Sequence, residues 1–280
     1  MTKKTWTIPY LNGTPSLKVE AESFAKAVEK VKDKLQDADL YEANLRGADL
    51  EGVNLNYSDL SYADLRGVNL RGAALKGVIL KGAALNYADL RGADLRGTNL
   101  ERANLKGAYF SWVNLKYAYL RGANLKGVSL NYADLSGANL HEADLEGAKL
   151  NATYLNGADL HEANLNGASL RGADLEGADL RDAFLIRASL KGARLNNAHL
   201  RGVNLKGSYL RGADLRGADL SRSDLEEADF SGTDLERADL KGARLNNTQL
   251  RGANLRGADL DGADLSRVDL SGAKGMPGLD

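Results

Sequence analysis

The chain of 280 residues contains no cysteine, which excludes disulfides and thiolate metal sites. It also lacks long hydrophobic runs, since no stretch approaches the ~18 apolar residues of a membrane-spanning helix. The N-terminal stretch MTKKTWTIPYLNG has none of the apolar core that a secretory signal carries. We therefore expect a cytoplasmic protein that does not bind membranes.

An excess of charge of one sign is missing as well. The chain has 37 Lys+Arg against 38 Asp+Glu, a net charge of −1. Bulk charge therefore does not favour nucleic acid as a direct partner. Large aromatic residues are scarce, with 4 Phe and 2 Trp. A core of this size must then be filled by other side chains, and the placement of Leu and Ala shows how.

Leucine occupies every fifth position from Leu40 to Leu270, except that Phe110 and Phe230 take its place twice, over 47 consecutive positions. Two residues before each of these positions is a small residue, usually Ala. The residue between them is mostly Asp or Asn. Glycine often follows two residues after the leucine, as in RGADLRGADL at 211–220.

A period of five fits neither regular element. Five residues of an α-helix turn by about 500°, so the leucines would form no stripe. On one long strand, an odd spacing would send successive leucines to opposite faces. The spacing predicts instead that the backbone turns once per repeat. Ala-Asp-Leu then forms a very short extended segment, and the next two residues form a corner at which Gly supplies unusual backbone angles.

The pattern A(D/N)LXX resembles the pentapeptide-repeat family over residues 36–270. The resemblance implies an all-β fold, a right-handed quadrilateral parallel β-helix with four repeats per coil. The 47 repeats would then form about twelve coils, roughly 55 Å at a strand spacing of about 4.8 Å. The closure of each coil by four repeats comes from the resemblance and not from the spacing.

The ends of the chain depart from the repeat. Residues 1–35 predict two strands joined by a turn, followed by a helix whose apolar stripe is Phe24, Val28, Val31 and Leu35. We expect this small α/β unit to cap the solenoid, with a separate binding module as the alternative. The three predicted segments are 1–35, the β-helix at 36–270 and a tail at 271–280. No helix covers the C-terminal end, and gyrase-inhibiting members of the family dimerise there, so a monomer and an end-to-end homodimer both remain open.

If residues twenty apart stack, the face that contains Leu40 carries 13 acidic and 7 basic residues. The resemblance implies that such an acidic face can imitate DNA, as in family members that bind DNA gyrase. The simpler interpretation is that each Asp binds the backbone of its own corner. The candidate acidic residues are Asp39, Asp59, Glu142, Asp159, Glu162, Asp179, Asp182, Asp219, Asp239 and Asp259.

Two other groups on the surface attract attention. His141 and His161 are one coil apart and each precedes a Glu, but stacked surface histidines are more often simply solvated, and we predict no metal site. Aromatic residues gather within two coils, either as a partner-binding surface or as a ladder that stabilises the sheet. The candidate partner-binding residues are Tyr109, Trp112, Tyr117, Tyr119 and Tyr132.

Motifs of enzyme chemistry are missing from the sequence: there is no nucleotide-binding loop, zinc-finger spacing or nucleophile elbow. A filled solenoid also offers no deep pocket that would exclude water. We therefore predict a protein that is not an enzyme and uses no cofactor. The leading hypothesis is a binding or scaffold protein with an unknown protein partner. The alternative is a DNA-mimicking inhibitor or protector of DNA gyrase or topoisomerase.

Overall fold

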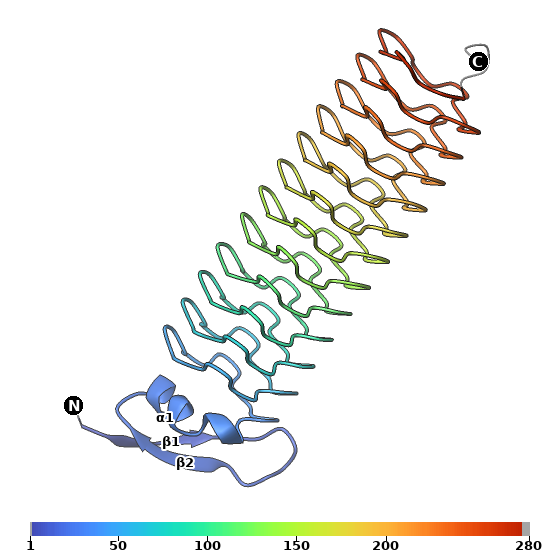
Figure 1. Cartoon of the computed structure of the whole chain (residues 1–280). Helices are drawn as coiled ribbons and strands as arrows, with labels where there is room; N and C mark the ends of the chain where they lie inside the picture. Colours follow the sequence, from blue (N-terminus) through green and yellow to red (C-terminus); the bar gives the residue numbers. More distant parts are fainter. Residues whose placement is uncertain (1, 276–280) are drawn as a thin grey trace. The chain divides into compact units, whose positions relative to one another are not determined.

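The computed structural model of the protein describes residues 2–275. Two compact units make up the chain, Met1–Asn139 and Leu140–Asp280. The first unit begins with the only named strands and helices among the described residues, and both units are otherwise built of similar short coils (Figure 1). None of the described helices has the length and apolar character needed to cross a bilayer.

A hairpin and a helix precede the repeats, as predicted. Strands β1 (Lys4–Ile8) and β2 (Leu17–Ala21) pair antiparallel, with Ile8 opposite Leu17. The connection is longer than a two-residue turn, because it takes in residues 9–16 with the Asn-Gly pair inside it.

Helix α1 (Phe24–Lys30) is shorter than the apolar stripe of the sequence suggests. It begins after Ser23, whose hydroxyl accepts a hydrogen bond from the Lys26 backbone N–H. It ends at Lys30, and a single turn of 3-10 helix, η1 (Lys32–Lys34), follows. Leu35, the last residue of the apolar stripe, is still buried after this more tightly wound turn. Burial of the stripe therefore does not require one continuous helix.

The N-terminal elements supply hydrogen-bond partners to the first coil. The backbone N–H of Asp39 donates to the Pro9 carbonyl at 2.9 Å, and that of Asp49 to the Glu29 carboxylate at 3.1 Å. One coil further on, the equivalent donor of Asp59 reaches the Ala38 carbonyl of the preceding coil. Pro9 and Glu29 thus take the place of a preceding coil. Without them, these backbone N–H donors of the first coil would have no partners.

In both units the repeats pair through single β-bridges, and each bridge is parallel and joins residues twenty apart. Asp39 pairs with Asp59 in the first unit, and Asp219 pairs with Asp239 in the second. Four five-residue repeats therefore complete one coil, as the family resemblance implies. Because each extended segment forms only one bridge with each neighbouring coil, the coils contain no named strands.

The corners are turns closed by a hydrogen bond from the small residue to the carbonyl of the leucine three residues before it, as from Ala48 to Leu45 at 3.0 Å. The residue before the small one has a positive φ, as at Gly47 (φ 67°). A positive φ at only the third residue is typical of a type II turn, for which glycine carries no steric penalty. The predicted role of the corner glycines is confirmed, but larger residues such as Trp112 (φ 63°) also occupy this position.

The core consists of the leucines and the small residues, which are buried to 8% exposure or less from Leu40 to Leu255. Phe110 and Phe230 are equally buried at leucine positions. Where the small residue is Ser or Thr, its hydroxyl usually binds a backbone carbonyl, as Thr98 does with Leu75 at 2.8 Å. In the last described coil the core opens, because Leu260, Leu265 and Leu270 are only half-buried. Residues 276–280 of the predicted tail lie outside the described residues.

Ser208 is an exception to this rule, since its buried hydroxyl oxygen has no hydrogen-bond partner in the part of the chain that the structure describes. Ser58, at an equivalent buried position, donates to the Leu35 carbonyl at 2.7 Å and accepts from the Ala38 N–H. We expect Ser208→Ala to raise the free energy of unfolding by about 1 kcal/mol, and Ser58→Ala to lower it by about 1–3 kcal/mol. Denaturation curves of the two variants measure the difference, and a loss of stability in both would contradict the prediction.

Candidate binding surfaces

Trp112 and Tyr132 form an exposed stack in the first unit. Their ring centroids lie 4.6 Å apart with planes inclined by 12°. Both residues occupy the left-handed corner position of successive coils, so the fold holds their Cα atoms one above the other. Trp112 remains 69% exposed and Tyr132 51% exposed. The predicted stacking of these two residues is confirmed.

The other three predicted aromatic residues are exposed but do not join this stack. Tyr109 precedes Phe110 on the same segment, and the Arg91 guanidinium carbon lies 5.9 Å from its ring centroid. Tyr117 and Tyr119 belong to the next two repeats. Among the described residues no ring contact connects them to Trp112 or Tyr132. The five side chains thus form one stacked pair with three separate neighbours.

Tyr117 illustrates a contact that recurs between coils. Its ring lies over the corner glycine of the next coil, Gly137, where an added Cβ would be only 2.8 Å from two ring carbons. The same arrangement repeats in three other pairs: Tyr57 with Gly77, Tyr62 with Gly82, and Tyr87 with Gly107. A glycine in the next coil therefore makes room for an aromatic residue at the corner.

A further aromatic site near the N-terminus was not predicted. The rings of Trp6 and Phe24 meet edge to face at 5.6 Å, and Lys4 Nζ lies 3.7 Å from the Trp6 ring centroid. Together with Tyr41 these rings line an open groove of about 550 Å³. The signal in the sequence that could have indicated this site is Trp6, one of only two tryptophans. Its neighbours come from separate segments, so the sequence did not show that they meet.

The predicted acidic residues divide into two structural groups. Seven aspartates each accept a hydrogen bond from the backbone N–H two residues further on, at 2.8–3.1 Å. This confirms the simpler interpretation, in which the aspartate binds its own corner. These are Asp39 and Asp59 in the first unit, and Asp159, Asp179, Asp219, Asp239 and Asp259 in the second.

Two of the seven also bind a cation. Arg181 contacts Asp179 at 2.5 Å, and Lys241 contacts Asp259 at 2.9 Å. Such pairs reduce the net charge that this face presents to a partner, although exposed ion pairs add little stability.

Glu142, Glu162 and Asp182 form the second group, since they occupy left-handed corners of the second unit. They lie beside the histidine pair. The rings of His141 and His161 stack at 5.1 Å, and His161 Nε2 is 3.4 Å from Glu162 and 3.7 Å from Asp182.

The histidine pair brings three potential metal ligands together. One nitrogen of His141, one of His161 and one oxygen of Glu162 lie within 4.8 Å of one another. Ligands bound to one zinc ion at about 2.0–2.2 Å lie about 3.5 Å apart, and His161 Nε2 and Glu162 already lie at 3.4 Å. That no metal binds these residues stays a prediction.

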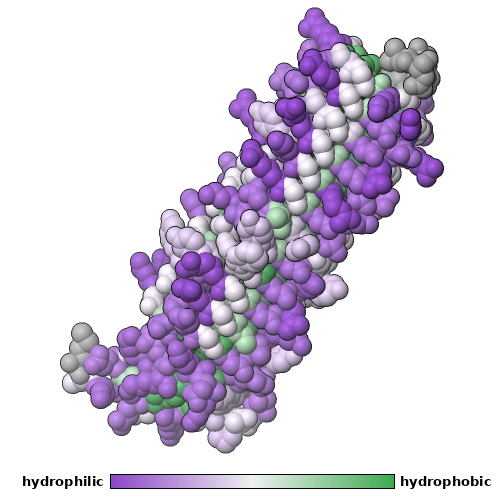
Figure 2. Space-filling view, viewed as in Figure 1, coloured by the Kyte–Doolittle hydropathy of each residue, from purple (hydrophilic) through white to green (hydrophobic). Residues whose placement is uncertain are grey.

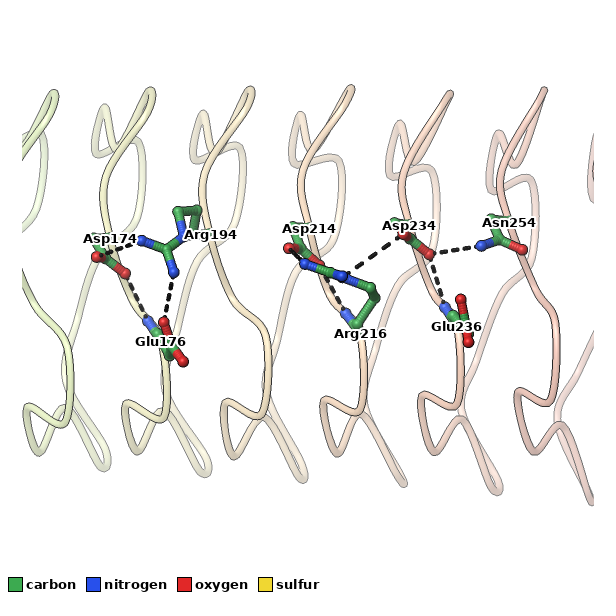
Figure 3. A network of polar contacts seen from close by, with 8 residues as sticks. All are labelled: Asp174, Glu176, Arg194, Asp214, Arg216, Asp234, Glu236 and Asn254. Atoms are coloured by element: carbon green, nitrogen blue, oxygen red, sulfur yellow. Dashed lines mark hydrogen bonds and ion pairs between the residues drawn. The ribbon is translucent and has the colours of Figure 1, made fainter.

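On the face that Figure 2 shows, hydrophilic side chains cover most of the surface and hydrophobic atoms emerge in narrow strips. Figure 3 shows how the charges on one face of the second unit are paired. Arg194 contacts Asp174 at 3.0 Å and Glu176 at 2.6 Å. Arg216 binds Asp214 at 2.6 Å, and its hydrogen bonds hold the pKa of the Asp214 carboxyl below its usual range.

Parallel bridges twenty residues apart, with a buried leucine in every repeat, define the protein as a β-helical repeat solenoid. The family profile described as "Pentapeptide repeats (8 copies)" matches the chain in successive stretches: 34–72, 63–102, 103–141, 138–177, 168–207, 204–242 and 233–272. The chain belongs to the pentapeptide-repeat family. A search of the curated proteins finds no significant match.

Several solved structures are similar to the chain. HetL, a pentapeptide repeat protein involved in heterocyst differentiation regulation from the cyanobacterium Nostoc sp. strain PCC 7120, is 31% identical, with 91% of this chain and 98% of HetL covered and a TM-score of 0.30. QnrB1, a plasmid-mediated fluoroquinolone resistance protein, is 22% identical in a trypsin-treated form, with 75% and 86% covered and a TM-score of 0.36. A thylakoid-lumen pentapeptide repeat protein of Arabidopsis thaliana is 29% identical, with 43% and 70% covered and a TM-score of 0.28. Because these TM-scores are low, family membership rests on the repeat match.

Proposed function

We propose that the protein is a non-catalytic binding protein, and that a protein partner binds the surface around Trp112 and Tyr132. The observation that carries the proposal is the exposure of the stacked pair, since Trp112 keeps 69% of its surface accessible after stacking. Tryptophan and tyrosine are enriched among residues that dominate binding energy at protein interfaces. The surface also includes the exposed Tyr109, three residues before Trp112, and the exposed Tyr117 and Tyr119 of the next two repeats.

The strained backbone conformation of Trp112 also supports the proposal that a partner binds here. A non-glycine residue in the left-handed region is disfavoured by about 1–2 kcal/mol, and Trp112 sits there with φ 63°. Tyrosines at other corners recover packing against a glycine of the next coil. Trp112 instead stacks on another exposed ring, which leaves a large apolar area in water. A partner that covers this area would gain the free energy of burying it.

Affinity capture with matched variants tests the proposal. Trp112→Ala and Tyr132→Ala remove the pair, and Tyr87→Ala is the control, because Tyr87 is also a 65% exposed corner residue with a positive φ. We expect at least one partner to be lost from both pair variants and retained by the control. Identical sets of captured proteins would contradict the proposal.

Fluorescence gives a direct measurement once a partner is in hand. The chain has only Trp6 and Trp112, so a Trp6→Phe variant reports on Trp112 alone. Binding should shift its emission to shorter wavelength as water leaves the ring. An unchanged spectrum in the presence of a saturating partner would place the interface elsewhere.

The second candidate is a DNA-mimicking inhibitor or protector of gyrase. Asp219, Asp239 and Asp259 support it, because they are bridged on successive coils of the second unit. One carboxylate per coil, or about 4.8 Å, is however sparser than the charge on DNA, about 1.7 Å apart along the axis. Purified protein at micromolar concentration should therefore leave gyrase supercoiling unchanged, with or without a quinolone. Inhibition or protection would favour the second candidate.

The proposal also includes the finer architecture: residues 1–35 as a cap, 36–270 as a right-handed β-helix of about twelve coils and 271–280 as a tail. Pro9 and Glu29 accept hydrogen bonds from backbone N–H groups of the first coil, and this supports the cap. The half-buried Leu260, Leu265 and Leu270 would suit an end-to-end homodimer, which sedimentation equilibrium distinguishes from a monomer.

A further inference from the structure

A groove of about 410 Å³ in the second unit is lined by cationic side chains. None of the described residues that line it carries a carboxylate, although the chain as a whole has one more acid than base. Ser189 and Tyr209 also line it. Its four cations are Arg171, Arg187, Lys191 and Arg211.

The local sequence explains why these cations have no carboxylate beside them. Wherever the repeat has Asp-Leu-Arg, the arginine binds the aspartate at 2.5–2.6 Å; the five triplets are 64–66, 89–91, 94–96, 179–181 and 214–216. In the groove the triplets are Ser-Leu-Arg at 169–171, Ser-Leu-Lys at 189–191 and Tyr-Leu-Arg at 209–211. Serine and tyrosine therefore replace the aspartate in three successive coils.

The three triplets are stacked. Ser169 pairs with Ser189, and Ser189 with Tyr209, through parallel bridges, so the cation of each triplet follows the last at a coil spacing of about 4.8 Å. Arg187 lines the groove from a left-handed corner of the adjoining repeat. Like charges at this spacing repel one another unless an anion lies between them.

Around Arg171 and Arg211 little on the protein offsets this charge. Arg211 Nε is 3.9 Å from Asp229, the first acid further along the same face. Arg171 Nε donates to the Ser189 hydroxyl at 3.2 Å, a neutral partner. On the face of Figure 3 every arginine drawn lies between carboxylates instead. Acidic and basic residues are nearly equal in number over the whole chain, but among the described residues only basic ones line this groove.

We propose that this groove binds an anion with two or three linked phosphate groups. Two guanidinium groups and an ammonium group in consecutive coils match a linear row of phosphates, and arginine binds phosphate oxygens through paired hydrogen bonds. The Ser189 hydroxyl accepts from Arg171 and keeps its own hydrogen to donate to a phosphate oxygen. Tyr209, 54% exposed, offers a ring beside the row to a ligand that carries a base.

The chain contains a matched control for the central cation. Lys191 and Lys241 both begin the sequence KGARLNN, at 191–197 and 241–247. Lys191 follows Ser189 and lines the groove, whereas Lys241 follows Asp239 and forms an ion pair with Asp259 at 2.9 Å. Lys191→Gln and Lys241→Gln therefore remove the same charge from the same local sequence.

Isothermal titration of the full chain with sodium tripolyphosphate at low salt tests the proposal. We expect binding that weakens about tenfold in Lys191→Gln and in Arg211→Gln, as the loss of one charge-assisted contact predicts. Lys241→Gln should bind within about twofold of the wild type, and added salt should weaken binding in all of them. Circular dichroism establishes that the variants keep the fold.

Two outcomes would overturn the proposal: no binding of tripolyphosphate, or an equal loss in Lys191→Gln and Lys241→Gln. A second titration with ATP separates the sources of the phosphates. Equal affinity for ATP and tripolyphosphate would indicate recognition of the phosphates alone. Tighter binding of ATP that is lost in Tyr209→Ala would indicate a nucleotide whose base lies on the Tyr209 ring.

Discussion

Replacing Leu165 by Ala is expected to lower the free energy of unfolding by about 3–5 kcal/mol. Leu165 lies in the interior of the second unit with 0% exposure, among leucines of the coils above and below. Close packing leaves no side chain free to fill the space, so the variant loses both the buried methyl groups and the contacts around the cavity. Urea denaturation gives the change in free energy.

Leu260→Ala is the control for this prediction, because Leu260 also belongs to the leucine column of the second unit but is only half-buried. Its truncation should have a clearly smaller effect, since part of its surface already contacts water. Repeat proteins can unfold in segments, so amide hydrogen exchange should accompany the denaturation curves. Equal losses of unfolding free energy at the two positions would contradict the prediction, because the interior of the core would then be packed no more closely than its end.

Replacing Gly137 by Ala is expected to be more damaging than the same change at Gly97. Both glycines occupy the same corner column of the first unit with nearly the same φ, 64° and 63°. Alanine in this region carries strain of about 1–2 kcal/mol at either position. Only at Gly137 would the new methyl group also meet the Tyr117 ring, at 2.8 Å, whereas nothing lies within 4 Å at Gly97. We expect an additional loss of about 1–2 kcal/mol at Gly137.

A double-mutant cycle separates strain from ring displacement. If the extra loss comes from the ring, Tyr117→Ala combined with Gly137→Ala should cost less than the sum of the two single changes. The free energy of unfolding of the four proteins gives the coupling. Additive effects would show that Tyr117 already moves freely and that the contact contributes nothing.

The sequence predicted the repeat, its corners and its core because one residue type recurs at one spacing. Leucine at every fifth position, a small residue beside it and glycine at the corner act within five residues, so no distant contact is needed to interpret them. The N-terminal hairpin was also predicted correctly, because its two strands and the connection between them are close together in the sequence. Helix α1 proved shorter than predicted, because the apolar stripe continues through a 3-10 turn that periodicity does not distinguish from helix.

The candidate sites were predicted less completely. Tallying charges along a whole face found one acidic face and three near-neutral ones, but most of the acids bind their own corners. The same tally concealed the cationic groove, since acids further along the face cancel its charge in the sum. The stack of Trp112 on Tyr132 was predicted once residues twenty apart were taken as neighbours, and the groove beside Trp6 was not.

The sequence by itself thus determined the class of fold and the column of buried leucines, because backbone turning and side-chain burial repeat within each five-residue unit. Only the tertiary structure decided which charges are paired, which rings stack and which hydroxyl stays without a partner. Many of those contacts join residues eighteen to twenty-three apart on neighbouring coils. Their geometry depends on how each side chain lies against the coil beside it, and spacing along the chain does not specify that.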